Sequence, residues 1–192
     1  MILRSRAATS SAVGIEGAAP SRSTEQAAAA LDGFVPFAGR GMRKPLKLRD
    51  GEAMLLDESY NASAAAVRAA LAVLALQPAT RRVAVLGDML ELGPAGVDLH
   101  RGLVDPIGEN EVDLVFCAGP LMASLWQALP SGSRGGYANS AAELEPQVVA
   151  AVRAGDALMV KASAGSRMGP IVKALVRRHS TQSASEPARA RG

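Results

Sequence analysis

Five short apolar runs alternate with stretches of helical periodicity between residues 53 and 175, and this alternation limits the fold more than any other feature of the sequence. Strands that are apolar on both faces are typical of a parallel sheet covered by helices on its two sides. We therefore predict an α/β fold with a Rossmann-like, mostly parallel sheet. The predicted strands are 53–57, 82–86, 113–117, a short 135–138, and 157–161.

The helices between these strands are predicted from apolar spacing. Val67, Leu71 and Leu74 recur at i, i+4 and i+7, which indicates a helix over 62–76. Other helices are predicted over 97–107 and 121–129. The last helix has an apolar stripe made of Met168, Ile171, Val172 and Leu175.

The start of the helix before the last strand has two interpretations. Ser140 and Glu143 form a capping-box pattern, which opens a helix at this point. Pro146 would then lie inside that helix, where proline is unfavourable, so a start nearer Pro146 fits equally well.

A hairpin and two terminal segments complete the predicted organisation. Asp50-Gly51 lies between the extended runs 44–48 and 52–56, which is a hairpin signal. Residues 1–33 are predicted to be disordered or a remnant of a preceding domain. Residues 34–179 are the predicted domain, and 180–192 a disordered tail.

Composition and charge exclude several classes of function. The single cysteine, Cys117, excludes an internal disulfide and a four-cysteine zinc site, and its apolar neighbours predict a buried thiol. The net charge of +3 comes from the tail after residue 176, so we predict no nucleic-acid partner. No apolar run approaches the ~18 residues of a membrane span. Without a secretory signal in residues 1–11, we predict a cytoplasmic protein with no membrane contact.

Polar segments follow three of the predicted strands, at 57–61, 87–93 and 161–167. In a parallel α/β sheet the ligand site lies beyond the carboxyl ends of the strands. In the first segment Asp57 and Asn61 can cap the following helix, or can meet a nucleotide or anion beside the helix start.

The second and third segments have the same ambiguity. Asp88 and Glu91, three residues apart, can hold Mg²⁺ or occupy a first helical turn. Lys161, Ser163 and Arg167 surround small residues, which can form an anion site or only a tight connection.

Neither histidine is predicted to be catalytic. His100 has no carboxylate at a spacing that indicates a dyad, so a structural role is expected, and His179 is expected to lie in the basic tail that begins at Arg177. The sequence contains no Gly-x-x-x-x-Gly-Lys-[Ser/Thr] motif and no Gly-x-Gly-x-x-Gly after a strand. A self-sufficient ATPase is therefore not predicted.

Four segments together resemble the carboxy-terminal domain of the Mur ligases, and among these most closely the ligases that add D-alanyl-D-alanine. The segments are FVPFAGRG (34–41), LDESYNA (56–62), VAVLGDMLELG (83–93) and VKAS (160–163). The resemblance extends from about residue 27 to residue 178. The segment 83–93 is the most specific of the four.

The resemblance implies a role in peptidoglycan synthesis. The family uses ATP and Mg²⁺ to form an acyl phosphate on UDP-MurNAc-tripeptide, which the amine of D-Ala-D-Ala then attacks. A full-length ligase also has a substrate-recognition domain and a P-loop domain, neither of which this sequence contains. We therefore expect the chain to be inactive alone and to bind ATP weakly, and either to work with a separate P-loop domain or to be a truncated product. The alternative is a non-catalytic module that keeps the fold and binds a nucleotide or a protein.

The same resemblance implies a set of site residues. Arg40 would contact the ATP phosphates, and three residues would line the nucleotide side of the cleft. These three are Asp57, Tyr60 and Asn61. Lys161 and Ser163 would face the substrates, and no catalytic or metal-binding residue is assigned.

Three residues, in two of the motifs, depart from what the family usually has. Ser63-Ala64 stands where the family has Asn-Pro, and Ala162 stands where it has Gly. A methyl group at 162 is unfavourable if the family's glycine has a positive φ or lies against a ligand.

Overall fold

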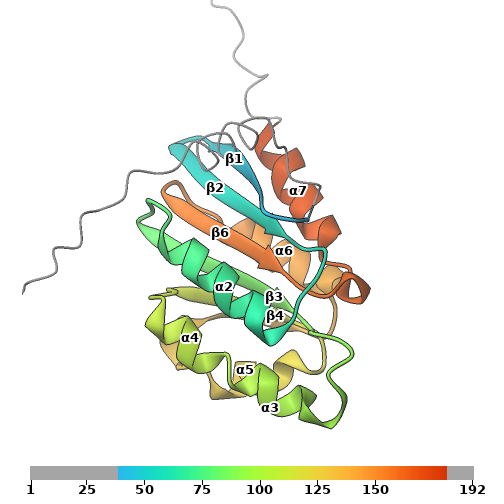
Figure 1. Cartoon of the computed structure of the whole chain (residues 1–192). Coiled ribbons are helices and arrows are strands. Elements are labelled where there is room, and N and C mark those ends of the chain that lie inside the picture. The colour runs from blue at the N-terminus through green and yellow to red at the C-terminus, as the bar shows by residue number, and fades with distance from the viewer. Residues whose placement is uncertain (1–38, 181–192) are drawn as a thin grey trace, which may run out of the picture. The chain divides into compact units, whose positions relative to one another are not determined.

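The computed structural model describes residues 39–180, which form a six-stranded sheet with helices on both faces. The order across the sheet is β1-β2-β6-β3-β4-β5 (Figure 1). β1 and β2 pair antiparallel, and the other neighbouring pairs are parallel. The strands are β1 (Met42–Leu48), β2 (Gly51–Glu58), β3 (Arg81–Gly87), β4 (Leu114–Ala118), β5 (Arg134–Ala138) and β6 (Asp156–Lys161). The predicted Rossmann-like sheet with its preceding hairpin is confirmed.

The helices divide into two groups, one on each face of the sheet (Figure 1). The first group is α2 (Ala64–Ala75), α3 (Gly96–Arg101), α4 (Val104–Glu109) and α5 (Met122–Ala128). The second group is α6 (Ala141–Ala151) and α7 (Gly169–Ser180). Alternate strand residues supply the two cores, so Leu56 packs with the first group and Leu55 with the second.

The predicted helix over 62–76 is present as α2. The side chains of Val67, Leu71 and Leu74 are at most 1% exposed, as their spacing indicates. Ser63 is the N-cap, and its side chain accepts a hydrogen bond from the backbone N–H of Ala66 at 3.2 Å. The apolar stripe predicted for the last helix is likewise buried against β1 and the neighbouring strands.

The single helix predicted over 97–107 is wrong, because two short helices occupy this segment. α3 ends at Arg101, and the N–H of Gly102 donates to the carbonyl of Asp98 at 2.8 Å. Pro106 does not cause the break. It lies in the first turn of α4, where the backbone N–H groups have no partner within the helix anyway.

The capping box determines where α6 begins. Ser140 Oγ accepts from the N–H of Glu143 at 3.3 Å and donates to Glu143 Oε1 at 3.0 Å. Pro146 lies inside the helix, so the interpretation that started the helix near Pro146 is wrong. Because Pro146 has no N–H, the carbonyl of Ala142 loses its helical partner, and Ala142 is exposed to solvent.

Two further predictions concern buried groups and the chain ends. Cys117 is fully buried, and burial, assisted by the charge of Asp88, raises the pKa of its thiol to about 12. His179 is 6% exposed within α7, so its placement in a tail is wrong. Burial, assisted by Arg178, lowers the pKa of His179. The predicted segment 1–33 lies outside the described residues, and so does the predicted tail 180–192 except for Ser180, which is the last residue of α7.

Candidate functional site

Two cavities lie at the carboxyl ends of the parallel strands, on either side of the loop between β6 and α7. Arg167 of this loop and Pro170 in the first turn of α7 line both of them. The β2-side cavity, of about 470 Å³, also contacts Asp57 and Tyr60. The β4-side cavity, of about 530 Å³, contacts the ends of β3 and β4 and the start of α6. The loops after β2, β3 and β4 lead to helices on one face of the sheet, and the loops after β5 and β6 lead to helices on the other face. Folds of this kind bind ligands at the strand ends where the connections change face.

Asp57 fixes the wall of the β2-side cavity. Its side chain is 3% exposed, and Oδ2 accepts from the N–H of Gly39 at 3.2 Å. Oδ1 accepts from Ser59 Oγ at 2.6 Å, and Lys44 Nζ lies 3.8 Å from Oδ2. The carboxylate therefore holds the segment before β1 against the end of β2.

Arg40 and Tyr60 form an exposed pair beside this wall. Cζ of Arg40 lies 4.4 Å from the centroid of the Tyr60 ring, and Tyr60 is 51% exposed. The backbone N–H of Tyr60 donates to the carbonyl of Gly39 at 3.1 Å. Gly39 has φ +81, and a Cβ there would lie 2.8 Å from Cβ of Tyr60, so this close approach requires glycine. An exposed guanidinium held on an aromatic ring can meet a phosphate or a base.

Asn61 and Lys161 are joined to each other at the end of β2. Lys161 is 4% exposed, and its Nζ donates to the carbonyl of Asn61 at 3.0 Å and lies 3.5 Å from Glu58 Oε2. Asn61 Oδ1 accepts from the N–H of Ala62 at 2.9 Å. Neither residue lines either of the two cavities.

Ser163 links the loops that follow β3 and β6. Its Oγ accepts from the N–H of Leu90 at 2.9 Å, and its N–H donates to the carbonyl of Asp88 at 3.1 Å. Ser163 is 7% exposed and lines neither cavity. The structure thus brings Lys161 and Ser163 close to the site, with both polar groups hydrogen-bonded inside the domain.

The segment 87–93 forms a loop held by Asp88 and His100. The carboxylate of Asp88 accepts from the backbone N–H groups of Leu121 at 3.3 Å and Met122 at 2.9 Å, at the start of α5. His100 Nε2 accepts from the N–H of Met89 at 2.9 Å, and Nδ1 lies 2.6 Å from the carbonyl of Gly96. The imidazole is therefore neutral and protonated on Nδ1, in the structural role predicted.

The predicted pair of Asp88 and Glu91 does not share a helical face. No helix contains either residue, and Glu91 is exposed with φ +64. Among residues 39–180, no group of three or more His, Cys, Asp and Glu side chains is placed to hold a metal ion.

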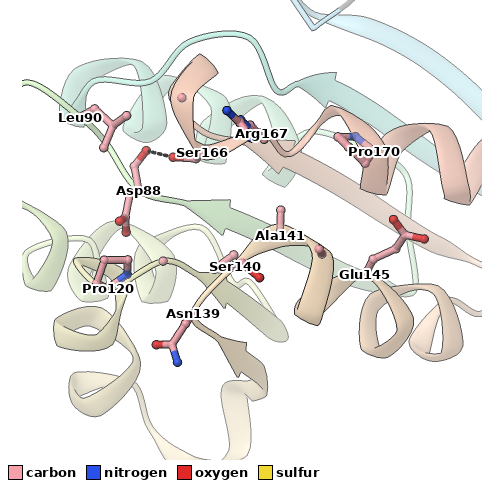
Figure 2. A pocket seen from close by; sticks show the side chains of 14 residues that line it. Asp88, Leu90, Pro120, Asn139, Ser140, Ala141, Glu145, Ser166, Arg167 and Pro170 are labelled. Atoms are coloured by element: carbon pink, nitrogen blue, oxygen red, sulfur yellow. Dashed lines mark hydrogen bonds between the residues drawn. The ribbon is translucent and has the colours of Figure 1, made fainter.

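The lining of the β4-side cavity includes residues that sequence reasoning missed. Glu145 and Asn139 come from α6 and from the end of β5, while Arg167 belongs to the third polar segment (Figure 2). Arg167 was indicated as a candidate site residue by its position beyond the end of a predicted strand. No sequence signal indicated Glu145, which lies one turn inside α6 and reaches the cavity only through helix packing.

Two of the three departures from the family motifs, Ser63 and Ala162, are accommodated structurally. Ser63 caps α2, a position that accepts Ser and Asn equally well. Ala162 is fully buried, and a Cβ built on Gly87 would lie 2.7 Å from its methyl group. Ala162 is not among the described residues with positive φ. The methyl group therefore fills space beside Gly87 in β3.

We predict that Ala162→Gly lowers the free energy of unfolding by about 1 kcal/mol, because it removes a buried methyl group and adds backbone freedom. Urea unfolding measures this change. Nucleotide affinity should stay the same, since the methyl group lies inside the domain. Ser63→Asn, the matched change at an exposed cap, should alter neither quantity. Tighter ATP binding by Ala162→Gly would show that the methyl group obstructs the site.

A Rossmann-like sheet with two cavities at its strand ends, and an exposed arginine–tyrosine pair beside one of them, places the chain in the class of α/β domains with an open strand-end site. No helix among the described residues is long and apolar enough to cross a membrane.

The family model of the Mur ligase, glutamate ligase domain, matches residues 46–164. The chain therefore belongs to the Mur ligase carboxy-terminal domain family.

Named relatives share one description, UDP-N-acetylmuramoyl-tripeptide–D-alanyl-D-alanine ligase. The Bacillus subtilis protein is 30% identical over 140 residues, covering 71% of this chain and 31% of the relative. The Synechocystis protein is 33% identical over 136 residues, covering 68% and 29%. The Mycobacterium tuberculosis protein is 31% identical over 180 residues, covering 80% and 34%. The chain thus spans about a third of the length of these relatives.

Solved structures agree with this fold. A crystal structure of MurF ligase from Thermotoga maritima in complex with ADP matches with a TM-score of 0.64 and 21% identity, over 78% of this chain and 33% of that one. A crystal structure of MurF from Acinetobacter baumannii matches with a TM-score of 0.66 and 22% identity, over 80% and 34%.

Proposed function

We propose that this chain is the carboxy-terminal domain of an ATP-dependent amide ligase that adds D-Ala-D-Ala to UDP-MurNAc-tripeptide in the cytoplasm. The named relatives support the substrates, since all share that description. The domain supplies one side of a cleft, and a P-loop domain outside this sequence supplies the other. The observation that carries the proposal is the exposed Arg40–Tyr60 pair beside the buried carboxylate of Asp57.

The residues present fit the nucleotide side of such a cleft. Arg40 offers a delocalised cation to a polyphosphate, and the Tyr60 ring offers a surface on which a base or ribose can lie. Lys44 and Lys173 line the same cavity and add positive charge near Asp57. The Thermotoga maritima relative was crystallised with ADP, which agrees with a nucleotide as the family's ligand.

The proposal assigns no Mg²⁺ ligand to residues 39–180, since they contain no metal-binding cluster. When bound, ATP with Mg²⁺ supplies the phosphoryl group that activates the substrate carboxylate. In this scheme Arg40 orients the polyphosphate and Asp57 fixes the loop that carries Arg40. Lys161 and Asn61 stabilise the end of β2 from within the domain. Their proposed role is to position the cleft wall.

The test is to replace the matching third of the Bacillus subtilis relative with this chain. ADP release is then measured with UDP-MurNAc-tripeptide and D-Ala-D-Ala. We expect ligation that requires D-Ala-D-Ala. Arg40→Ala should raise the KM for ATP at least about tenfold, the loss of one charge-assisted contact. Arg43→Ala, an exposed neighbour on β1, serves as the matched control. An equal KM for ATP in the Arg40→Ala and Arg43→Ala variants would show that Arg40 does not contact the nucleotide.

Calorimetry on the chain alone separates the proposal from a non-catalytic nucleotide-binding module. Half a site should bind ATP with Mg²⁺ no more tightly than about millimolar. Micromolar binding would indicate a complete nucleotide site in this chain and would contradict the proposed division between two domains. Absence of ligation by the exchanged protein, with its folding confirmed, would favour a module that retains only the fold.

A further inference from the structure

A groove runs between α6 and α7, the two helices that cover one face of the sheet (Figure 1). It consists of two adjoining cavities of about 560 and 540 Å³, which share Val149, Ala150 and Arg178. The first cavity lies between the two helices, and the second continues to the turn of the β1–β2 hairpin. We call this feature the α6–α7 groove; its lining comes from residues 145–154, 174–179 and 48–50.

The α6–α7 groove leads away from the strand-end site. Its hairpin end lies beside the amino ends of β2 and β6, because residues 48–50 directly precede Gly51 and residues 152–154 closely precede Asp156. β2 and β6 are parallel, so their amino ends lie at the edge of the sheet opposite their carboxyl ends. An occupant of the hairpin end therefore leaves the Arg40–Tyr60 pair open to solvent.

The charge of the groove is mainly positive. Its charged lining residues are four arginines, Arg49, Arg153, Arg177 and Arg178, and two carboxylates, Asp50 and Glu145. Arg49, Arg153 and Arg178 are exposed, and within residues 39–180 no hydrogen bond or ion pair engages their side chains. Like charges gathered with too few counter-charges repel one another, so an anionic occupant lowers the electrostatic energy of the groove.

The helix dipoles account for only part of this cluster. Arg177 and Arg178 lie in the last turn of α7, where cations offset the negative end of the dipole. That end carries about half an elementary charge, which one arginine already offsets. Arg49 belongs to the hairpin turn and to no helix. The convergence of arginines from the hairpin, from α7 and from the loop after α6 therefore indicates a binding surface.

The lining between the arginines is aliphatic and suits a single chain. Val149 and Ala150 of α6 and Ala174 of α7 line the first cavity. From Glu145 to Ala151 the axis of α6 rises by about 10 Å, which an extended segment of about three residues covers. A membrane surface is flat and does not enter such a groove. An acidic protein segment supplies both carboxylates and apolar side chains, whereas a nucleic-acid backbone supplies only charge.

We propose that the α6–α7 groove is a docking surface for an acidic segment of a partner protein. Carboxylates of that segment pair with Arg49, Arg153 and Arg178, since a guanidinium can donate two parallel hydrogen bonds to a carboxylate. Apolar side chains between the carboxylates lie on Val149 and Ala174. The inference does not depend on the proposed function, because the groove is separate from the nucleotide side of the strand-end site.

The experiment is fluorescence polarisation with the full chain and a fluorescein-labelled peptide of about eight residues that alternates glutamate and alanine. A second peptide, in which glutamine replaces glutamate, has the same length without the charge. We expect the glutamine peptide to bind at least about tenfold more weakly than the glutamate peptide. The affinity of the glutamate peptide should fall as the ionic strength rises.

Charge reversals test the arginines. Arg49→Glu and Arg178→Glu should each weaken binding of the glutamate peptide about three- to tenfold, because an exposed ion pair becomes a repulsion. Arg101→Glu makes the same change in net charge on α3, on the other face of the sheet, and should leave the affinity unchanged. Asp50→Asn gives an Asn-Gly turn, which hairpins accept, and should strengthen binding about two- to fivefold by removing a carboxylate from the groove. Circular dichroism confirms that each variant is folded.

Three outcomes would overturn the inference. The first is no binding of the glutamate peptide at millimolar concentration. The second is equal weakening by Arg101→Glu and Arg49→Glu, since binding would then follow net charge and not the groove. The third is binding of duplex DNA or of phosphatidylglycerol vesicles through Arg49 and Arg178 while the glutamate peptide does not bind. None of these outcomes affects the proposed function, which ADP release by the exchanged protein tests separately.

Discussion

Gly119→Ala should lower the free energy of unfolding by about 3 kcal/mol or more, a large share of the stability of a domain of this size. Gly119 follows β4 with φ +115, and a Cβ there would collide with the carboxylate of Asp88. Asp88 cannot move away without leaving the N–H groups of Leu121 and Met122 unpaired. The variant therefore adds backbone strain and breaks buried hydrogen bonds together. Urea unfolding followed by circular dichroism measures the loss.

The matched control is Gly108→Ala in α4. A Cβ at Gly108 meets no atom within 4 Å, and its φ is not positive. This variant should be neutral or stabilising by up to about 1 kcal/mol, because alanine favours a helix. Similar stability of the two variants would show that the loop after β4 can shift to accept a Cβ at position 119. The contact between Gly119 and Asp88 would then not fix the shape of the β4-side cavity.

Asp156→Ala should lower the free energy of unfolding by about 3 kcal/mol. Asp156 is 3% exposed at the start of β6, opposite Arg81 of β3. Arg81 Nε and Nη2 donate to its two carboxylate oxygens at 2.9 and 2.7 Å, and the N–H of Arg153 donates to Oδ2 at 2.8 Å. The hydrogen bond to Asp156 is the main reason that the pKa of Arg81 is raised. Alanine leaves this guanidinium without its counter-charge and one backbone N–H without its acceptor.

Two comparisons test this explanation by chemical denaturation. Glu52→Ala removes an exposed carboxylate from β2 and should change the stability by less than about 0.5 kcal/mol. Adding Arg81→Met to Asp156→Ala removes the orphaned cation, so the double variant should be more stable than Asp156→Ala alone. A double variant that is less stable would indicate that Arg81 acts through its bond to the carbonyl of Ala151.

The sequence predicted which residues lie at the edge of the sheet, because a residue at the end of a parallel strand must lie there. Asp57 and Lys161 lie in the last residues of β2 and β6, Asn61 and Ser163 lie just beyond these strands, and all four are therefore at that edge. Their orientation was not predictable. Lys161 donates to the carbonyl of Asn61, 100 residues earlier, so only the pairing of β2 with β6 turns its charge inward. Arg40 and Tyr60, by contrast, remain exposed.

The sequence by itself determined the element order, the parallel sheet and the edge at which the polar loops gather, because burial on both faces is visible in apolar runs and helical spacing. Only the tertiary structure decided which charges are satisfied. Asp88 accepts hydrogen bonds at the start of α5, whereas Glu145 and Arg167, which belong to different elements, line one cavity. The physical reason is that partners for a buried charge come from residues distant in sequence, and no local pattern records them.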